Sequence, residues 1–280
     1  MEENNSMYTS IKDVEIYYEI YGEGTPILML HGFSPDMELM KGCMEPFFQK
    51  SGASYKRIYI DLPGMGKSKQ FAHLNNTDDM LDIVIGFIEK EIQNEPFLIA
   101  AESYGGYLAR GVIAKESFSI LGAFFICPVI YAARDKRTLP VKQTAAAKDE
   151  LFLLTLGSDI KVAFEENCVV LNEYTYNRWM KEIVSGMNRA DQPFLEKIAS
   201  NYSFSSWFEE PNFEQPSVFL LGRQDDVVGF QDALHLKDNF PQATYAILDG
   251  AGHNLQIERP ILFDAYLDDW LKRIHDRKLR

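Results

Sequence analysis

The sequence predicts an α/β fold in which a mostly parallel sheet of about eight strands is covered by helices on both faces and carries an inserted helical segment. Two observations lead to this prediction. Short, continuously apolar segments recur along the chain, as in strands that are buried on both faces. Segments with apolar residues at helical spacing lie between them. The 280 residues are enough for one large domain with an insertion.

The first predicted strands differ from the others because charged residues are interspersed in them. Residues 8–21 form two β-like pieces separated by Lys12 and Asp13, which is typical of a half-exposed antiparallel hairpin at a sheet edge. The segment from Gly22 to Pro26 is a turn signal. The buried strands that follow are predicted at residues 27–30, 57–60, 97–100, 123–127, 217–221 and 244–248.

Two helices between and after these strands have clear start signals. Thr77 is expected to cap a helix, with Asp78 and Asp79 in its first turn, where the helix dipole favours negative charge. Apolar residues then recur at helical spacing as far as residue 92. Near the end of the chain, Pro260 is expected to open a helix that keeps one apolar face as far as Ile274.

Residues 129–210 break the alternation of strands and helices. This stretch has no strong strand signal but several helical patterns, including residues 145–154 and 174–184, and it is rich in large aromatic residues. We therefore predict a core domain made of residues 1–128 and 211–280, with residues 129–210 inserted as a helical cap, or lid.

The charge and the cysteine content limit the classes of binding partner and the cellular compartment that we expect for this protein. With 28 basic and 41 acidic residues, the formal net charge of −13 disfavours nucleic acids and anionic membrane surfaces as partners. No apolar run approaches the roughly 20 residues that cross a bilayer. The N-terminus lacks the pattern of a signal peptide, and the three cysteines have no metal-like spacing. We expect free thiols and a cytoplasmic location.

Ser103 lies in the most informative motif of the chain. It follows the apolar segment 97–100 and precedes an amphipathic helical pattern, in the arrangement small-x-Ser-x-Gly-Gly. This pattern is typical of a nucleophile elbow, a sharp turn that exposes the serine oxygen and aims the Tyr104 amide at the same point. Gly105 fits the tight turn, whereas Ala101 replaces the usual first glycine. A serine that merely caps a helix after a buried strand is the alternative interpretation.

A nucleophilic serine needs a base, an acid that orients this base, and donors for the developing oxyanion. His253 is the best candidate base, because it follows the last predicted strand among small residues. His31 is expected to shape its own loop, and the remaining histidines lie in polar stretches that we expect to be exposed; these are His73, His235 and His275.

The acid and the second oxyanion donor are expected at the ends of two other strands. Asp225 and Asp226 both follow the strand 217–221, and charge alone does not choose between them. Gly32 follows the strand 27–30 and allows a sharp turn, so that the Phe33 amide can face the cleft together with the Tyr104 amide.

Over nearly its whole length the chain resembles the α/β-hydrolase superfamily. The family's order of nucleophile, acid and base is present. In this family the aspartate three residues after the strand-end glycine is usually the acid, which favours Asp225. Alanine at position 101 departs from the usual motif. The motifs that carry the resemblance are His31-Gly32-Phe33, Asp61-x-Pro-Gly-x-Gly-x-Ser68, the Ser103 elbow, Gly222-x-x-Asp225 and Gly252-His253.

The resemblance implies a serine hydrolase that needs no metal or organic cofactor. Ser103 would attack an acyl carbonyl, His253 would take its proton, Asp225 would hold the imidazolium, and the amides of Phe33 and Tyr104 would bind the oxyanion. The expected substrate is a small-molecule carboxylic ester of fairly apolar character.

Other members of this fold reuse the same triad. The alternatives are therefore a carbon–carbon bond hydrolase, a lyase, a peroxidase-like enzyme, an acyltransferase, an aminopeptidase or a non-catalytic ligand-binding protein. Tyr174, Tyr176 and Trp179 are candidate substrate contacts in the cap, although aromatic residues at helical spacing more often form a core. No sequence signal indicates an oligomeric state.

Overall fold

The computed structural model describes residues 5–141, 147–205, 210 and 212–278. Its main sheet has eight strands in the order β1-β2-β4-β3-β5-β6-β9-β10. The pairs β1–β2 and β2–β4 are antiparallel and all other neighbours are parallel, which confirms the predicted fold class and the edge hairpin. The strands of this sheet are β1 (Asn5–Ile11), β2 (Val14–Tyr21), β3 (Thr25–Leu30), β4 (Tyr55–Ile60), β5 (Phe97–Glu102), β6 (Ile120–Ile126), β9 (Ser217–Gly222) and β10 (Ala243–Leu248).

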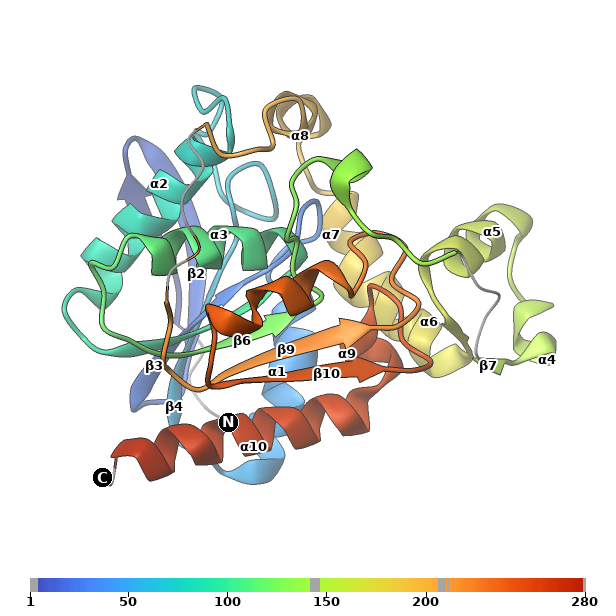
Figure 1. Ribbon diagram of the computed structural model, residues 1–280. Coiled ribbons are helices and arrows are strands. Elements are labelled where there is room, and N and C mark those ends of the chain that lie inside the picture. Colours follow the sequence, from blue (N-terminus) through green and yellow to red (C-terminus); the bar gives the residue numbers. More distant parts are fainter. Residues whose placement is uncertain (1–4, 142–146, 206–209, 211, 279–280) are drawn as a thin grey trace.

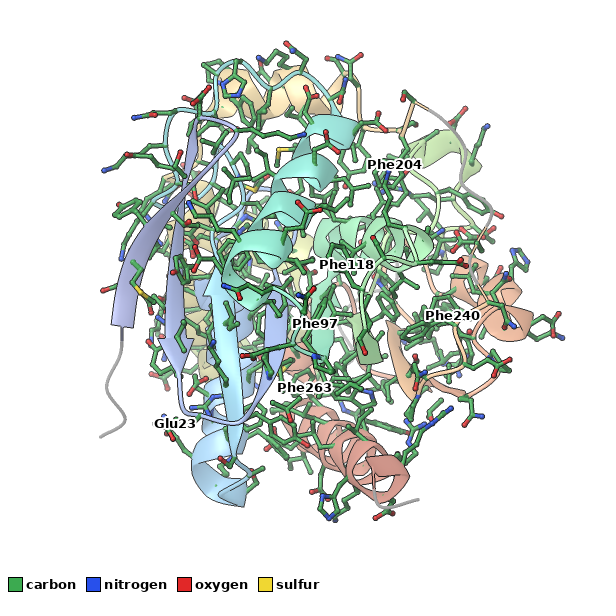
Figure 2. The ribbon with its side chains drawn as sticks, turned by 90° about the vertical axis from the view of Figure 1, so that its left-hand side faces the viewer. Glu23, Phe97, Phe118, Phe204, Phe240 and Phe263 are labelled. Carbon is green, nitrogen blue, oxygen red and sulfur yellow. The ribbon has the colours of Figure 1, made fainter. Side chains whose placement is uncertain are left out.

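The central strands are buried because helices cover both faces of the sheet. Helices α1 and α10 lie on one side of the sheet, and α2 and α3 lie on the other (Figure 1). Phe97 in β5 and Phe263 in α10 are both buried in the interior, whereas Glu23 lies in an exposed turn at the edge of the molecule (Figure 2). The covering helices are α1 (Glu38–Ser51), α2 (Thr77–Phe87, continued by the π-helical segment Ile88–Ile92), α3 (Ser103–Ala114), α9 (Leu255–Glu258) and α10 (Pro260–Lys278).

The N-terminal cap of α2 differs from the prediction by one residue. The side chain of Asn76, not Thr77, accepts a hydrogen bond from the Asp79 backbone N–H. Thr77 is the first helical residue, and its hydroxyl donates instead to the Tyr202 carbonyl at 2.8 Å. The sequence Asn76-Thr77 offers two good capping residues in a row, and the contact with Tyr202 occupies the second of them. Pro260 opens α10 as predicted.

Between β6 and β9 most regular elements of the described residues are helices, and helices α4, α5 and α6 lie beyond the carboxyl ends of β9 and β10 (Figure 1). The two-residue strands β7 (Ala147–Lys148) and β8 (Val170–Leu171) pair in parallel there, which the sequence did not predict. The helices are α4 (Glu150–Leu153), α5 (Ser158–Asn167), α6 (Glu173–Trp179, continued by the π-helical segment Met180–Val184), α7 (Ser185–Met187) and α8 (Gln192–Ala199).

Two helix predictions in this region have different outcomes. The helix predicted at 174–184 is confirmed by α6 and its π-helical continuation. The helix predicted at 145–154 is mostly wrong: it is limited to α4, because Asp149 caps a helix whose preceding residues pair with β8. Positions 145 and 146 lie outside the described residues.

The division into a core of residues 1–128 and 211–280 and a cap of residues 129–210 stays a prediction, and positions 142–146, 206–209 and 211 also lie outside the described part. Within the described ranges, no helix has both the length and the apolar character that crossing a membrane requires.

Candidate active site

Ser103 occupies the strained turn between β5 and α3. Its φ of +51° lies in the left-handed region that residues with a side chain seldom adopt. A Cβ on Gly105 would lie 2.4 Å from the Leu30 carbonyl oxygen, so only glycine fits where α3 approaches β3. Ala101 is completely buried in β5, where its methyl group is accommodated. Because α3 begins at Ser103 itself, with Glu102 at the capping position, the helix-cap interpretation of this serine is wrong.

His253 connects Ser103 to Asp225 across three separate loops. Its Nε2 lies 3.0 Å from Ser103 Oγ, and its Nδ1 lies 2.9 Å from Asp225 Oδ2. Asp225 is fully buried, and its Oδ1 accepts hydrogen bonds from the N–H groups of Val227 at 2.9 Å and Val228 at 3.0 Å. The side chain pointing at the imidazole is therefore that of Asp225, while Asp226 lines the pocket that also contains Ser103 and His253.

The charges around His253 favour its protonated form. Burial lowers the pKa of His253, but the charge and hydrogen bond of Asp225, together with the charge of Glu102, outweigh burial and raise it to about 9. Burial likewise opposes ionisation of Asp225, but the attraction of His253 and the two backbone donors lower the pKa of this carboxyl below its usual value. Asp225 thus fixes a proton on Nδ1 and leaves Nε2 facing the serine.

The two expected oxyanion donors lie on segments that contact each other beside Ser103. The rings of Phe33 and Tyr104 pack edge to face, with their centroids 5.2 Å apart. A Cβ on Gly32 would lie 3.2 Å from the Ser103 Cβ, so the loop after β3 runs directly against the elbow. Tyr104 is in the first turn of α3, where a backbone N–H has no partner within the helix.

The other histidines are placed as the sequence predicts. His31 is fully buried; its Nε2 accepts a hydrogen bond from the Leu62 N–H at 3.0 Å, so its Nδ1–H donates to the Gly32 carbonyl at 2.7 Å. Burial lowers the pKa of His31 to about 4, which keeps this ring neutral while it supports the Gly32 loop. His73, His235 and His275 are exposed.

A pocket of about 340 Å³ opens onto Ser103 and His253. Much of its lining is apolar, and it also contains several polar groups. Its residues outside the triad include Phe33, Leu39, Glu102, Val129, Arg137, Glu166, Asn167, Ile183, Met187, Tyr202 and Val228.

Among the described residues, the lining of this pocket does not include Tyr174, Tyr176 or Trp179. The rings of Tyr176 and Trp179 pack against Phe164 instead, with centroids 5.4 and 5.5 Å away, and Tyr174 accepts a hydrogen bond from Arg178 at 3.1 Å. Tyr176 and Trp179 thus pack among the helices between β6 and β9, which is the more common position for aromatic residues at helical spacing, whereas Tyr174 is 51% exposed.

Several residues at the site carried no motif in the sequence. Glu102 precedes the nucleophile directly, and its Oε1 lies 3.3 Å from His253 Nε2. Glu258 accepts hydrogen bonds from Val169 and from Gly252, the residue before His253. The position of Glu102 next to Ser103 could have indicated its presence at the site. The partners of Glu258 depend on contacts between distant segments, so no local pattern indicated them.

Cys127, Asp225 and His253 place a possible ligand atom each within 4.8 Å of one another, which is close enough to hold a metal ion. However, Asp225 and His253 already hydrogen-bond each other. Burial also raises the pKa of the Cys127 thiol well above its usual range, whereas a metal binds the thiolate. These three residues therefore form a poor metal site in this arrangement.

Comparison with known proteins places this geometry in a family. A model described as the alpha/beta hydrolase fold matches residues 25–260. The structure of an alpha/beta superfamily hydrolase from Oenococcus oeni PSU-1 is similar, with a TM-score of 0.86 and 30% sequence identity over 96% of this chain and 99% of that one.

Two characterised relatives are more distant in sequence. Monoacylglycerol lipase ABHD6 from Bos taurus is 23% identical over 96% of this chain and 82% of its own length. Pimeloyl-(acyl-carrier protein) methyl ester esterase from Legionella pneumophila (strain Corby) is 20% identical over 92% of this chain and 100% of its own length. The chain belongs to the alpha/beta hydrolase fold family.

Proposed function

We propose that this protein is a serine hydrolase that cleaves carboxylic esters of small, fairly apolar molecules through an acyl-enzyme. The observation that carries the proposal is the continuous contact from Ser103 Oγ to His253 Nε2, 3.0 Å, and from His253 Nδ1 to Asp225, 2.9 Å. The relatives named as a lipase and an esterase support the same reaction class.

In the proposed reaction Ser103 Oγ attacks the ester carbonyl carbon while its proton passes to His253 Nε2. The negative charge on the carbonyl oxygen is bound by the backbone N–H groups of Phe33 and Tyr104, and Asp225 stabilises the imidazolium. When the tetrahedral intermediate collapses, His253 returns the proton to the departing alcohol. A water molecule then attacks the acyl-serine by the same route, with His253 again as the base, and the carboxylic acid leaves.

The pocket supports a small substrate. Its volume of about 340 Å³ is near the lower end of the roughly 300–1,000 Å³ usual for ligand pockets. Side chains such as Leu39, Ile183 and Met187 supply apolar contacts for an acyl or alcohol group. The unpaired, buried Cys43, Cys127 and Cys168 support the cytoplasm, a reducing compartment, as the proposed location.

Covalent labelling with a fluorophosphonate tests the proposed nucleophile. Wild type should be labelled and Ser103→Ala should not, because the reagent phosphonylates a serine that a neighbouring histidine activates. Ser54→Ala, which alters an exposed serine, is the matched control and should be labelled like wild type. Absence of labelling in well-folded wild type would show that the protein is a ligand-binding member of the family rather than an enzyme.

A substrate panel tests the proposed bond and size. Chromogenic esters of graded acyl length should show the highest kcat/KM for short acyl groups, because the pocket is small. Amide, carbon–carbon and acyl-transfer substrates run in parallel should be turned over more slowly. A preference for one of these, or for long acyl chains, would contradict the proposed substrate class.

A further inference from the structure

The imidazole of His253 lies between two carboxylates, only one of which belongs to the proposed triad. Asp225 contacts Nδ1 at 2.9 Å, and Glu102 Oε1 lies 3.3 Å from Nε2, on the side where Ser103 Oγ also lies at 3.0 Å. Glu102 is 2% exposed and lines the same pocket as Ser103 and His253. A second buried carboxylate therefore faces the nitrogen that must take the serine proton.

The same carboxylate also supports the loop after β3. It accepts a hydrogen bond from the Gly32 backbone N–H, and a Cβ on Gly32 would lie 2.1 Å from Glu102 Oε2. Gly32 directly precedes Phe33, whose own amide is a proposed oxyanion donor. Glu102 thus touches two parts of the site that approach the substrate from different strands.

Within the described part of the chain, no permanent positive charge lowers the pKa of Glu102. Among the described residues, His253 is the group whose charge lowers the pKa of Glu102, while burial, which is the largest effect, and the charge of Asp225 raise it to about 7. The positive charge of Arg137 lowers the pKa of His253. Among the described residues, the charge of Glu102 also raises the pKa of three other groups, which are Cys43 in α1, Cys127 after β6 and Tyr202.

This arrangement has a consequence for the proton on Nε2. A neutral imidazole with its proton on Nδ1 has one lone pair on Nε2, and Ser103 needs that lone pair. An ionised Glu102 beside Nε2 favours the protonated ring. The charge of Glu102 therefore raises the pH at which His253 loses its proton and becomes the free base. The same charge stabilises the imidazolium once the serine proton has been transferred.

We propose that Glu102 is a positioning residue that holds the Gly32 peptide beside the elbow and, through its negative charge, sets the pH above which His253 acts as the base. The second part rests on the proposed function. The expected acid limb of kcat/KM lies above the usual histidine range, since the protonated ring is favoured by both Asp225 and Glu102.

Two substitutions separate the charge of Glu102 from its contact with Gly32. Glu102→Gln keeps an oxygen that can accept from the Gly32 N–H but removes the charge, so the acid limb should move to lower pH by about one unit or more. Glu102→Ala removes both, so it should show the same shift together with a fall of kcat at the plateau, of at most the ~10²–10³-fold that loss of an oxyanion donor causes. Acid limbs that coincide in wild type and both variants would overturn the inference.

A control and a second measurement make the outcome unambiguous. Asp249→Asn removes an exposed carboxylate from the same loop as His253 and should leave the acid limb in place. An NMR titration of the His253 ring needs no substrate and should show a lower pKa in Glu102→Gln than in wild type. If this holds while wild type hydrolyses no ester, the proposed function fails and the role of Glu102 stands. If wild type hydrolyses esters and the His253 titration is unchanged by Glu102→Gln, the role of Glu102 fails alone.

Discussion

The environments of the neighbouring residues Asp225 and Asp226 give two identical side chains different roles. Asp225 is completely buried, and both of its oxygens are occupied, one by His253 and one by the backbone N–H groups of Val227 and Val228. The side chain of Asp226 is partly exposed and turns toward the pocket. The two carboxylates are chemically identical, but they make different contacts. Their substitution by asparagine should therefore have very different effects on catalysis.

Asp225→Asn should lower kcat/KM by about 10⁴-fold, because the amide favours the wrong tautomer of His253 and does not stabilise the imidazolium. Asp226→Asn is the matched control and should cost less than about tenfold, since Asp226 lies on the pocket wall and Asp225 is the residue that holds the imidazole. Steady-state kinetics on any ester from the panel measures both values. Equal losses in the two variants would contradict the assignment of Asp225 as the acid.

At the scale of elements, Glu258 at the end of α9 joins the loop that carries His253 to the strand β8. Its Oε2 accepts a hydrogen bond from the Gly252 N–H at 2.6 Å, and its Oε1 accepts from the N–H groups of Val169 and Val170. Burial raises the pKa of this carboxyl, while the three backbone donors oppose the rise. Glu258 therefore connects the loop of the proposed base to the chain between β6 and β9.

Glu258→Ala should lower the free energy of unfolding by roughly 2–6 kcal/mol, because the buried N–H groups of Val169 and Gly252 lose this acceptor and each costs about 1–3 kcal/mol. It should also lower kcat, since Gly252 directly precedes His253. Glu258→Gln retains one acceptor oxygen and should lose less stability. Urea denaturation of the three proteins measures the difference, and an alanine variant as stable as wild type would show that the contacts of Glu258 carry no net stability.

At the scale of the whole molecule, the net charge of −13 predicts weak interaction with polyanions. Labelled duplex DNA and immobilised heparin should not bind the protein at low salt, where electrostatic attraction is strongest. An anion-exchange resin should retain it at neutral pH, which serves as the positive control. Affinity for DNA that weakens as salt is added would reveal a basic surface and contradict the expected absence of a nucleic-acid partner.

Much of the site was predictable because its signals are local. A buried strand, a small residue, the serine and a glycine in a row indicated a strained turn, and Ser103 has a φ of +51°. The parallel strands bring their carboxyl ends to one edge, so residues after different strands were expected to meet there. The prediction of pocket residues was less successful, since Tyr176 and Trp179 pack against Phe164 and Tyr174 does not line the described pocket.

The sequence by itself determined the strands and the elbow, because each depends on residues that are close along the chain, and it also determined the order of serine, acid and histidine, which is read directly from the chain. The family resemblance favoured Asp225 over Asp226, and in the structure Asp225 reaches His253. Only the tertiary structure decided that Glu102 faces the same ring from the other side. His253 and Ser103 are 150 residues apart, so their contact depends on how several strands and loops pack together. The pattern of parallel strands placed these residues at one edge of the sheet, but the distances between their atoms follow from packing.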